Sequence, residues 1–135
     1  MRACAEHRGS VGTEWDFRVG QVDGTDTLFV PDVAFVSHER LRSLSKPDRE
    51  EPPFSPDVAV EVRSPSNDPR YRERKIARYL ATGAIVVLDV DPRTRTMAIH
   101  ERGSMRVVGE HERLDSVALP WVSFDVAKAF EELDD

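Results

Sequence analysis

Two short apolar runs separated by a helical segment constrain the fold of this chain more than any other feature. The runs are 58–62 (VAVEV) and 84–90 (AIVVLDV), which have the length and the β-branched content of buried strands. Between them, Asp68 is a favourable N-cap, Pro69 suits the first helical position, and Gly83 lies where the helix should end. This order predicts a right-handed βαβ unit with parallel strands.

The residues before this unit predict shorter elements. Residues 15–19 alternate like a short strand, and 27–36 (TLFVPDVAFV) form a β-rich run in which Pro31 marks an edge or a strand start. Ser37 is a candidate cap for a helical turn over the next seven residues. The proline-rich and charged stretch 45–56 is predicted to be an exposed loop.

Turns after the second apolar run predict an antiparallel meander, with strands over 96–101 and 105–109. A final helix capped by Ser123 should follow. The fold class is therefore α/β with a mixed sheet, built on the βαβ core. The length of 135 residues is suited to one domain, so we expect a single domain over 1–135.

Composition excludes several classes of protein. No run approaches the roughly 18 apolar residues of a membrane span, and the first residues have no apolar stretch typical of a secretion signal. A single cysteine, Cys4, fits a reducing compartment, so we expect a cytoplasmic protein with no membrane contact. The net charge of −6 argues against a general nucleic-acid coat, although a local basic patch remains compatible with DNA binding. The four histidines are too scattered for a zinc pattern.

Glu61 is the most informative polar residue. Strand alternation places it on one face with Ala59 and Arg63, while the valines of the run take the other face. A carboxylate in so apolar a strand is costly unless a cation, a metal or several donors meet it. The structural alternative is a salt bridge from Glu61 to Arg63 or Arg78.

Asp32 lies in the other β-rich run. If the two strands are neighbours, Asp32 and Glu61 meet at one edge of the sheet, where two carboxylates make a hard oxygen site suited to Mg²⁺. The alternative is a turn or capping role, since an aspartate at a strand start commonly has one.

Lys75 is the third candidate. It shares a helix face with Tyr71 and Arg78 and borders the apolar stripe, within reach of the strand that carries Glu61. The alternative is an ordinary surface lysine whose stem covers apolar residues. The segment 63–78 is densely basic, which indicates either a local phosphate-binding surface or solvated charge.

Several motifs occur together in this chain: VPDVAFV (30–36), PDVAVEVRSPS (56–66), Lys75, Tyr79, Gly83, VDP (90–92) and LPWVSFDVA (119–127). From about residue 9 to the end, they resemble the Uma-type (Uma-two) restriction endonucleases, which belong to the PD-(D/E)XK nuclease superfamily. The resemblance implies a restriction-endonuclease-like fold and a nuclease that hydrolyses DNA.

The resemblance also implies roles for individual residues. Asp32 would be the first metal-binding acid and Glu61 the second, with Mg²⁺ as the cofactor and Mn²⁺ as a substitute. The catalytic lysine, moved from the strand to the following helix, would be Lys75. Arg63 occupies the position of the strand lysine in other members of the superfamily and is a candidate to share its role.

Two departures from the family pattern leave alternatives open. Relatives usually begin with several dozen residues, including a helix and a hairpin, before the point that matches residue 9, and we expect this chain to lack them. Tyr71 stands where many members have an aspartate. Both departures favour completion of the fold in a homodimer, or a catalytically degenerate member that acts as a dimerising or nucleic-acid-binding module. A third alternative is an enzyme that acts on another phosphorylated substrate.

Overall fold

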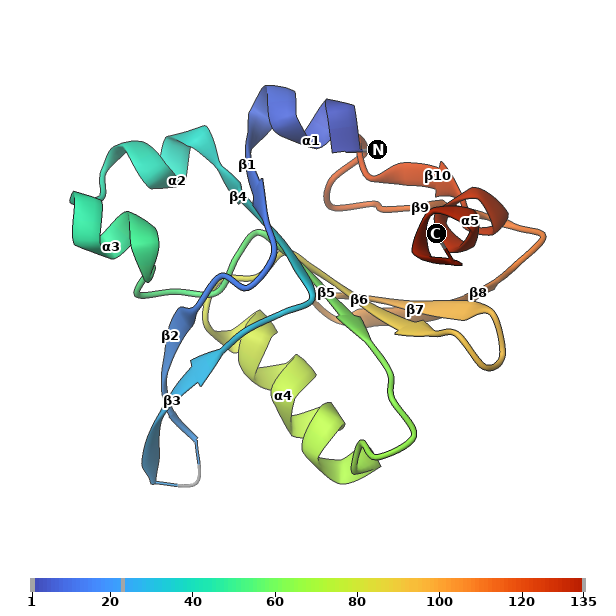
Figure 1. The fold of residues 1–135 in the computed structure, drawn as a ribbon, viewed down its shortest axis with the longest axis horizontal. Helices are drawn as coiled ribbons and strands as arrows, with labels where there is room; N and C mark the ends of the chain where they lie inside the picture. Colours follow the sequence, from blue (N-terminus) through green and yellow to red (C-terminus); the bar gives the residue numbers. More distant parts are fainter. Residues whose placement is uncertain (1, 23, 135) are drawn as a thin grey trace.

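The predicted βαβ unit forms the centre of the molecule. A computed structural model describes residues 2–22 and 24–134 (Figure 1). Strands β5 (Val58–Val62) and β6 (Val86–Asp91) pair in parallel, and α4 (Pro69–Ala81) connects them. The Asp68 side chain caps the helix by accepting a backbone hydrogen bond of 3.0 Å from its first turn. Gly83, with φ of +116°, follows the helix in a conformation that favours glycine.

Four further strands extend the sheet on both sides of this unit. The strand order is β1-β4-β5-β6-β7-β8, and every pair except β5–β6 is antiparallel. The mixed α/β fold and the predicted meander, now β7–β8, are therefore confirmed. These strands are β1 (Gly9–Gly12), β4 (Val33–Ser37), β7 (Thr96–Glu101) and β8 (Ser104–Gly109).

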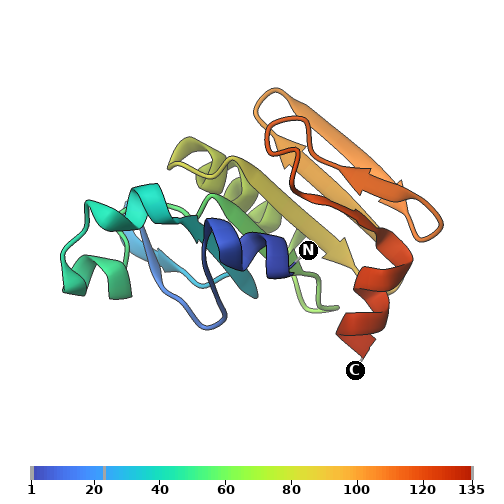
Figure 2. The same cartoon turned by 90° about the horizontal axis from the view of Figure 1, so that it is seen from above.

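The two faces of the sheet are covered by different helices, as Figures 1 and 2 show. Helix α4 covers one face, where its buried Ile76 and Tyr79 join Ala59 and Val87 in one apolar cluster. That cluster also includes residues of the antiparallel hairpin formed by β2 (Phe17–Val22) and β3 (Thr25–Phe29). The opposite face of the sheet packs against α1 (Arg2–Arg8) and α5 (Val126–Asp134).

The β-rich run over 27–36 contains parts of two strands, in agreement with the prediction that Pro31 marks an edge or a strand start. Strand β3 ends at Phe29 and pairs with β2, whereas β4 begins at Val33 and joins the central sheet. Pro31 lies in the break and has no N–H to donate, so continuous pairing is interrupted there. This break places Asp32 at the start of β4.

Two predictions need correction. The stretch 45–56 contains the short helix α3 (Lys46–Glu50), because the Ser45 hydroxyl accepts a hydrogen bond from the backbone N–H of Asp48. Ser123 does not cap the last helix, because it begins β10 (Ser123–Asp125), which pairs with β9 (Arg113–Asp115).

The helical turn after Ser37 is confirmed as α2 (His38–Arg42), and the Ser37 side chain caps it. No helix within residues 2–22 and 24–134 is long and apolar enough to cross a membrane.

Candidate active site

The structure brings Asp32 and Glu61 together on neighbouring strands. Val33 of β4 pairs with Val60 of β5, and extension of this antiparallel register by one residue sets Asp32 opposite Glu61. The backbone N–H of Val62 donates a hydrogen bond of 2.7 Å to Oδ2 of Asp32. The Asp32 carboxylate is therefore fixed against the end of β5, beside Glu61.

Helix α4 contributes two donors to Glu61. The Lys75 ammonium lies 2.9 Å from Oε1 of Glu61, and the Tyr79 hydroxyl donates to the same oxygen at 2.6 Å. Lys75 and Tyr79 are four residues apart, so one face of the helix presents both of them to the strand. The Lys75 stem is not merely covering apolar surface, because its ammonium is paired with a side chain that is only 16% exposed.

Tyr79 acts only as a donor. Its side chain is completely buried, and this burial, together with the negative charge of Glu61, raises the pKa of the Tyr79 hydroxyl far above its usual value. No role for Tyr79 was predicted from the sequence. Its spacing of four residues from Lys75 was the available signal, because it puts both side chains over the same strand position.

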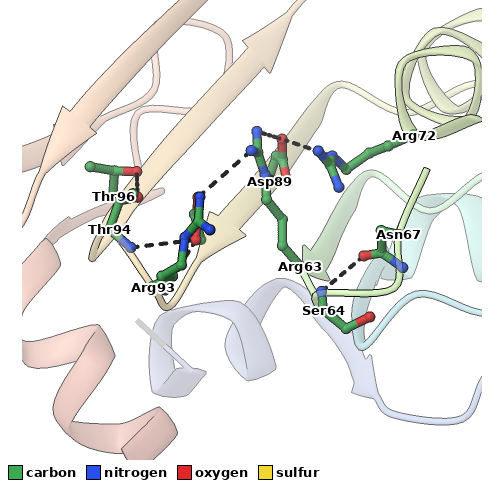
Figure 3. Close-up of polar contacts among 9 residues, drawn as sticks. Arg63, Ser64, Asn67, Arg72, Asp89, Arg93, Thr94 and Thr96 are labelled. Atoms are coloured by element: carbon green, nitrogen blue, oxygen red, sulfur yellow. Dashed lines mark hydrogen bonds and ion pairs between the residues drawn. The ribbon is translucent and has the colours of Figure 1, made fainter. Parts of the chain in front are cut away.

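A second charged cluster, shown in Figure 3, adjoins the first, because its Asp89 on β6 pairs in register with Glu61 on β5. Arg63 makes a two-point contact with Asp89 of β6, from Nε to Oδ1 at 3.1 Å and from Nη2 to Oδ2 at 2.7 Å. Nε of Arg72 lies 3.8 Å from Oδ2 of Asp89. We call Arg63, Arg72 and Asp89 the arginine cluster, and Asp32, Glu61 and Lys75 the acidic site.

The arginine cluster corrects the structural alternative for Glu61. Glu61 forms its ion pair with Lys75 rather than with Arg63 or Arg78. The hydrogen bond to Asp89 raises the pKa of Arg63, against the opposing effect of burial, and Arg78 donates from Nε to the carbonyl of Val19 at 2.7 Å. Arg63 pairs with Asp89 of β6 instead of Glu61, because Asp89 is a buried carboxylate that requires a cation of its own.

A cavity of about 60 Å³ joins the acidic site to the arginine cluster. It lies between the end of β5 and the first turns of α4, and its walls include Glu61 and Lys75 as well as Arg63 and Arg72. Asn67, on the loop that enters α4, also lines it, and the Asn67 side chain accepts a hydrogen bond of 2.9 Å from the backbone of Ser64.

The donor set at the acidic site fits a divalent cation bound by few protein ligands. Within the described residues, Oε2 of Glu61 and Oδ1 of Asp32 have no hydrogen-bond or ion-pair partner. This part of the chain also has no group of three or more His, Cys, Asp or Glu side chains placed to hold a metal. Mg²⁺ is commonly held by one or two carboxylates, with waters and substrate phosphates as its other ligands.

Comparisons with known proteins identify a family and a fold for this chain. A family model described as "Uma2: Putative restriction endonuclease" matches residues 2–127. Among solved structures, the chain is similar to a crystal structure from Anabaena variabilis described as "a putative nuclease belonging to DUF820", with a TM-score of 0.76 and 16% sequence identity. That match covers 95% of this chain and 71% of the other, and it supports the restriction-endonuclease-like fold. The search of curated proteins found no match. Because the family match extends over nearly the whole chain, this protein belongs to the Uma2 family.

Proposed function

We propose that the protein is an endonuclease that hydrolyses phosphodiester bonds of DNA at the acidic site, with Mg²⁺ as its cofactor and Mn²⁺ as a substitute. The observation that carries the proposal is the meeting of Asp32, Glu61 and Lys75 at the ends of β4 and β5. One carboxylate oxygen of each acid has no partner among the residues that the structure describes. Membership of the Uma2 family supports the same reaction class.

Asp32 and Glu61 would hold the metal ion. When bound, Mg²⁺ lowers the pKa of a coordinated water and offsets the negative charge of the phosphate. The chain itself fixes both carboxylates beforehand, since Asp32 accepts from the backbone of β5 and Glu61 accepts from Tyr79. Such preorganisation avoids the cost of reorienting the ligands during the reaction.

Lys75 provides the positive charge of the site. Its ammonium, 2.9 Å from Glu61, is placed to donate to the attacking water or to a phosphate oxygen beside that carboxylate. A donor aimed at charge that develops in the transition state typically contributes about 10²-fold to 10³-fold in rate. Lys75 is therefore the residue whose loss we expect to remove catalysis while leaving the carboxylates in place.

Tyr79 acts as a positioning residue. Its buried hydroxyl donates to Oε1 of Glu61 and so leaves Oε2 as the oxygen without a protein partner. This contact selects one rotamer of Glu61, because the alternative rotamers would leave a buried hydroxyl without an acceptor.

Cleavage of supercoiled plasmid and of single-stranded DNA in Mg²⁺ or Mn²⁺ tests the proposal. The comparison is between the wild type, Lys75→Ala and Asp32→Asn, with Lys46→Ala of α3 as a matched control for the loss of a lysine. We expect the wild type and the control to cleave and the two site variants to be inactive.

Equal cleavage by all four proteins would assign the activity to a different site or to a contaminant. A folded wild type that leaves every DNA intact would refute the nuclease, and a nucleic-acid-binding module would then be the better interpretation.

A further inference from the structure

We propose that Arg63 and Arg72 bind a second phosphate of the nucleic-acid strand, adjacent to the phosphate that is cleaved, and that Asp89 is the positioning residue for both. The inference rests on the proposed function, because the acidic site defines which phosphate is cleaved. The ligand is a phosphodiester group recognised by its charge and its oxygen acceptors, without regard to the base that it carries.

The arginine cluster has more donors than the protein uses. Asp89 is 3% exposed, and the two-point contact with Arg63 already supplies a hydrogen bond to each of its oxygens. Arg72 is a second guanidinium at the same carboxylate, and its side chain is only 17% exposed. Within the described residues, no guanidinium nitrogen of Arg72 makes a hydrogen bond. A largely buried guanidinium with five donors and no acceptor is suited to an anion that completes its contacts.

The arginine cluster is aligned with the acidic site along both the strand and the helix. Arg63 directly follows β5, and strand alternation puts it on the same face as Glu61, about 7 Å further along the chain. On α4, Arg72 precedes Lys75 by three residues, and so lies one turn away on a neighbouring position.

The directions of the two elements agree with this alignment. A helix that connects parallel strands runs antiparallel to them, so a forward step along β5 corresponds to a backward step along α4. The chain thus builds two adjacent pairs, Glu61 with Lys75 and Arg63 with Arg72, which face each other across one cavity. The separation of the two pairs is comparable with that of neighbouring phosphates on one strand.

The surroundings leave the cluster attractive to anions. Two further acids lie nearby. Oδ2 of Asp91 lies 3.7 Å from Nη1 of Arg63, while its Oδ1 accepts from the backbone of the β6–β7 turn. Asp68 also lines the cavity, and its side chain caps α4. Residues 61–78 nevertheless contain six basic and three acidic side chains, in a chain whose net charge is −6. This local excess of basic side chains, two of which are Arg63 and Arg72 in the cavity wall, favours a polyanion at this position.

The salt dependence of nucleic-acid binding tests the inference without requiring cleavage. Each phosphate contact that is lost lowers the slope of log K against log[salt] by about 0.9 for duplex DNA and about 0.7 for single strands. We would measure binding of fluorescein-labelled single-stranded and duplex oligonucleotides to the full chain in the presence of EDTA. The variants are Arg72→Gln, the double variant Arg63→Leu/Asp89→Leu, and the control Arg42→Gln on the exposed surface of α2.

We expect Arg72→Gln and the double variant each to reduce the slope by about one contact, and to weaken binding at low salt by about fivefold to tenfold, while Arg42→Gln matches the wild type. The double variant removes Arg63 and Asp89 together but leaves Arg72 without its carboxylate, so urea denaturation must show that it is folded before its slope is compared. A slope equal to that of the wild type in folded Arg72→Gln and in the double variant would overturn the inference and leave the cluster a purely structural ion pair.

This test is separable from the test of the nuclease itself. If the wild type fails to cleave DNA but the slopes change as expected, the phosphate-binding assignment of the arginine cluster stands and the proposed reaction does not. If Lys75→Ala abolishes cleavage while the slopes remain equal, the reaction stands and the second phosphate site is wrong.

Discussion

Glu61 and Asp89 are neighbouring carboxylates in matched positions with different surroundings. They pair in register across the parallel strands β5 and β6, on the face of the sheet that α4 covers. The Glu61 side chain is 16% exposed and receives both of its donors on one oxygen. The Asp89 side chain is 3% exposed and has both oxygens occupied by Arg63. Two acids in one row of a sheet thus have different capacities, because one retains a free oxygen for a cation and the other does not.

The strongest test of this comparison is the loss of each carboxylate in turn. Glu61→Gln removes the charge that would hold the metal, and we expect cleavage of DNA to fall by at least about 10²-fold. Arg63→Leu/Asp89→Leu removes the neighbouring pair, and we expect a loss of less than about tenfold at low salt, since it changes binding only. Single-turnover cleavage of plasmid measures both, and equal losses would remove the functional distinction between the two acids.

Loss of Asp89 should affect the stability of the fold, although its effect on cleavage is the smaller of the two. Asp89→Ala leaves Arg63 and Arg72 without their carboxylate, and we expect a loss of about 2 kcal/mol in the free energy of unfolding. The value is below that of a fully buried pair, because the Arg63 side chain is 37% exposed and water screens it. Urea denaturation measures this loss.

The double variant Arg63→Leu/Asp89→Leu serves as the control for stability. It should recover part of the loss in Asp89→Ala, because it removes Arg63 together with its partner, while Arg72 stays without a carboxylate. A double variant that is as unstable as Asp89→Ala would mean that packing, and not the unpaired charge, causes the effect.

Removal of the Tyr79 hydroxyl tests whether Glu61 depends on the hydrogen bond that it accepts from Tyr79. Tyr79→Phe preserves the ring packing against Phe29 and removes only the donor to Glu61, so we expect a loss of about 1 kcal/mol in stability and a reduction in cleavage smaller than that of Glu61→Gln. Urea denaturation and plasmid cleavage of the same preparation give both numbers. Cleavage at the wild-type rate would show that Glu61 needs no positioning by Tyr79.

The smallest effect that we expect is the contribution of His100 to the pH dependence of stability. Burial lowers the pKa of His100, although the charge of Asp89 opposes this, and the buried Nε2 of His100 has no hydrogen-bond partner in the described part of the chain. A lowered pKa means that the unfolded chain takes up a proton first, so stability declines as the pH falls below about 6.5, the ordinary value for histidine. Urea denaturation at pH 7.5 and pH 5.5 should show a smaller decline in His100→Leu than in the wild type. An identical decline in both would assign the effect to other groups.

The central fold could be predicted from the sequence because local signals agreed there. The alternation over β5, the cap at Asp68 and the turn at Gly83 each favour the same βαβ unit, and the structure confirms it. Pro31 indicated the break between β3 and β4, but the partner strand that each half joins could not be predicted, because composition over 27–36 is uniformly β-rich.

The partners of the charged residues were harder to predict than their positions. Strand alternation put Glu61 and Arg63 on one face, but the choice of Lys75 for Glu61 depends on how α4 crosses the sheet. The pairing of Arg63 with Asp89 depends on the register of β5 and β6, which the sequence alone does not specify. Several expectations stay predictions. They are the functional roles of Asp32, Glu61 and Lys75, the dependence on Mg²⁺, the homodimer, and the single domain over 1–135.

A metal titration followed by the melting temperature tests the central claim most directly, namely that Glu61 holds a divalent cation and Asp89 does not. A ligand that binds only the folded state stabilises it by an amount that grows with its concentration, about 2.7 kcal/mol at one hundred times the dissociation constant. We predict that Mn²⁺ or Mg²⁺ raises the melting temperature of the wild type and of Arg63→Leu/Asp89→Leu equally, and leaves that of Glu61→Gln unchanged. An equal rise in Glu61→Gln, or no rise in the wild type, would contradict the account.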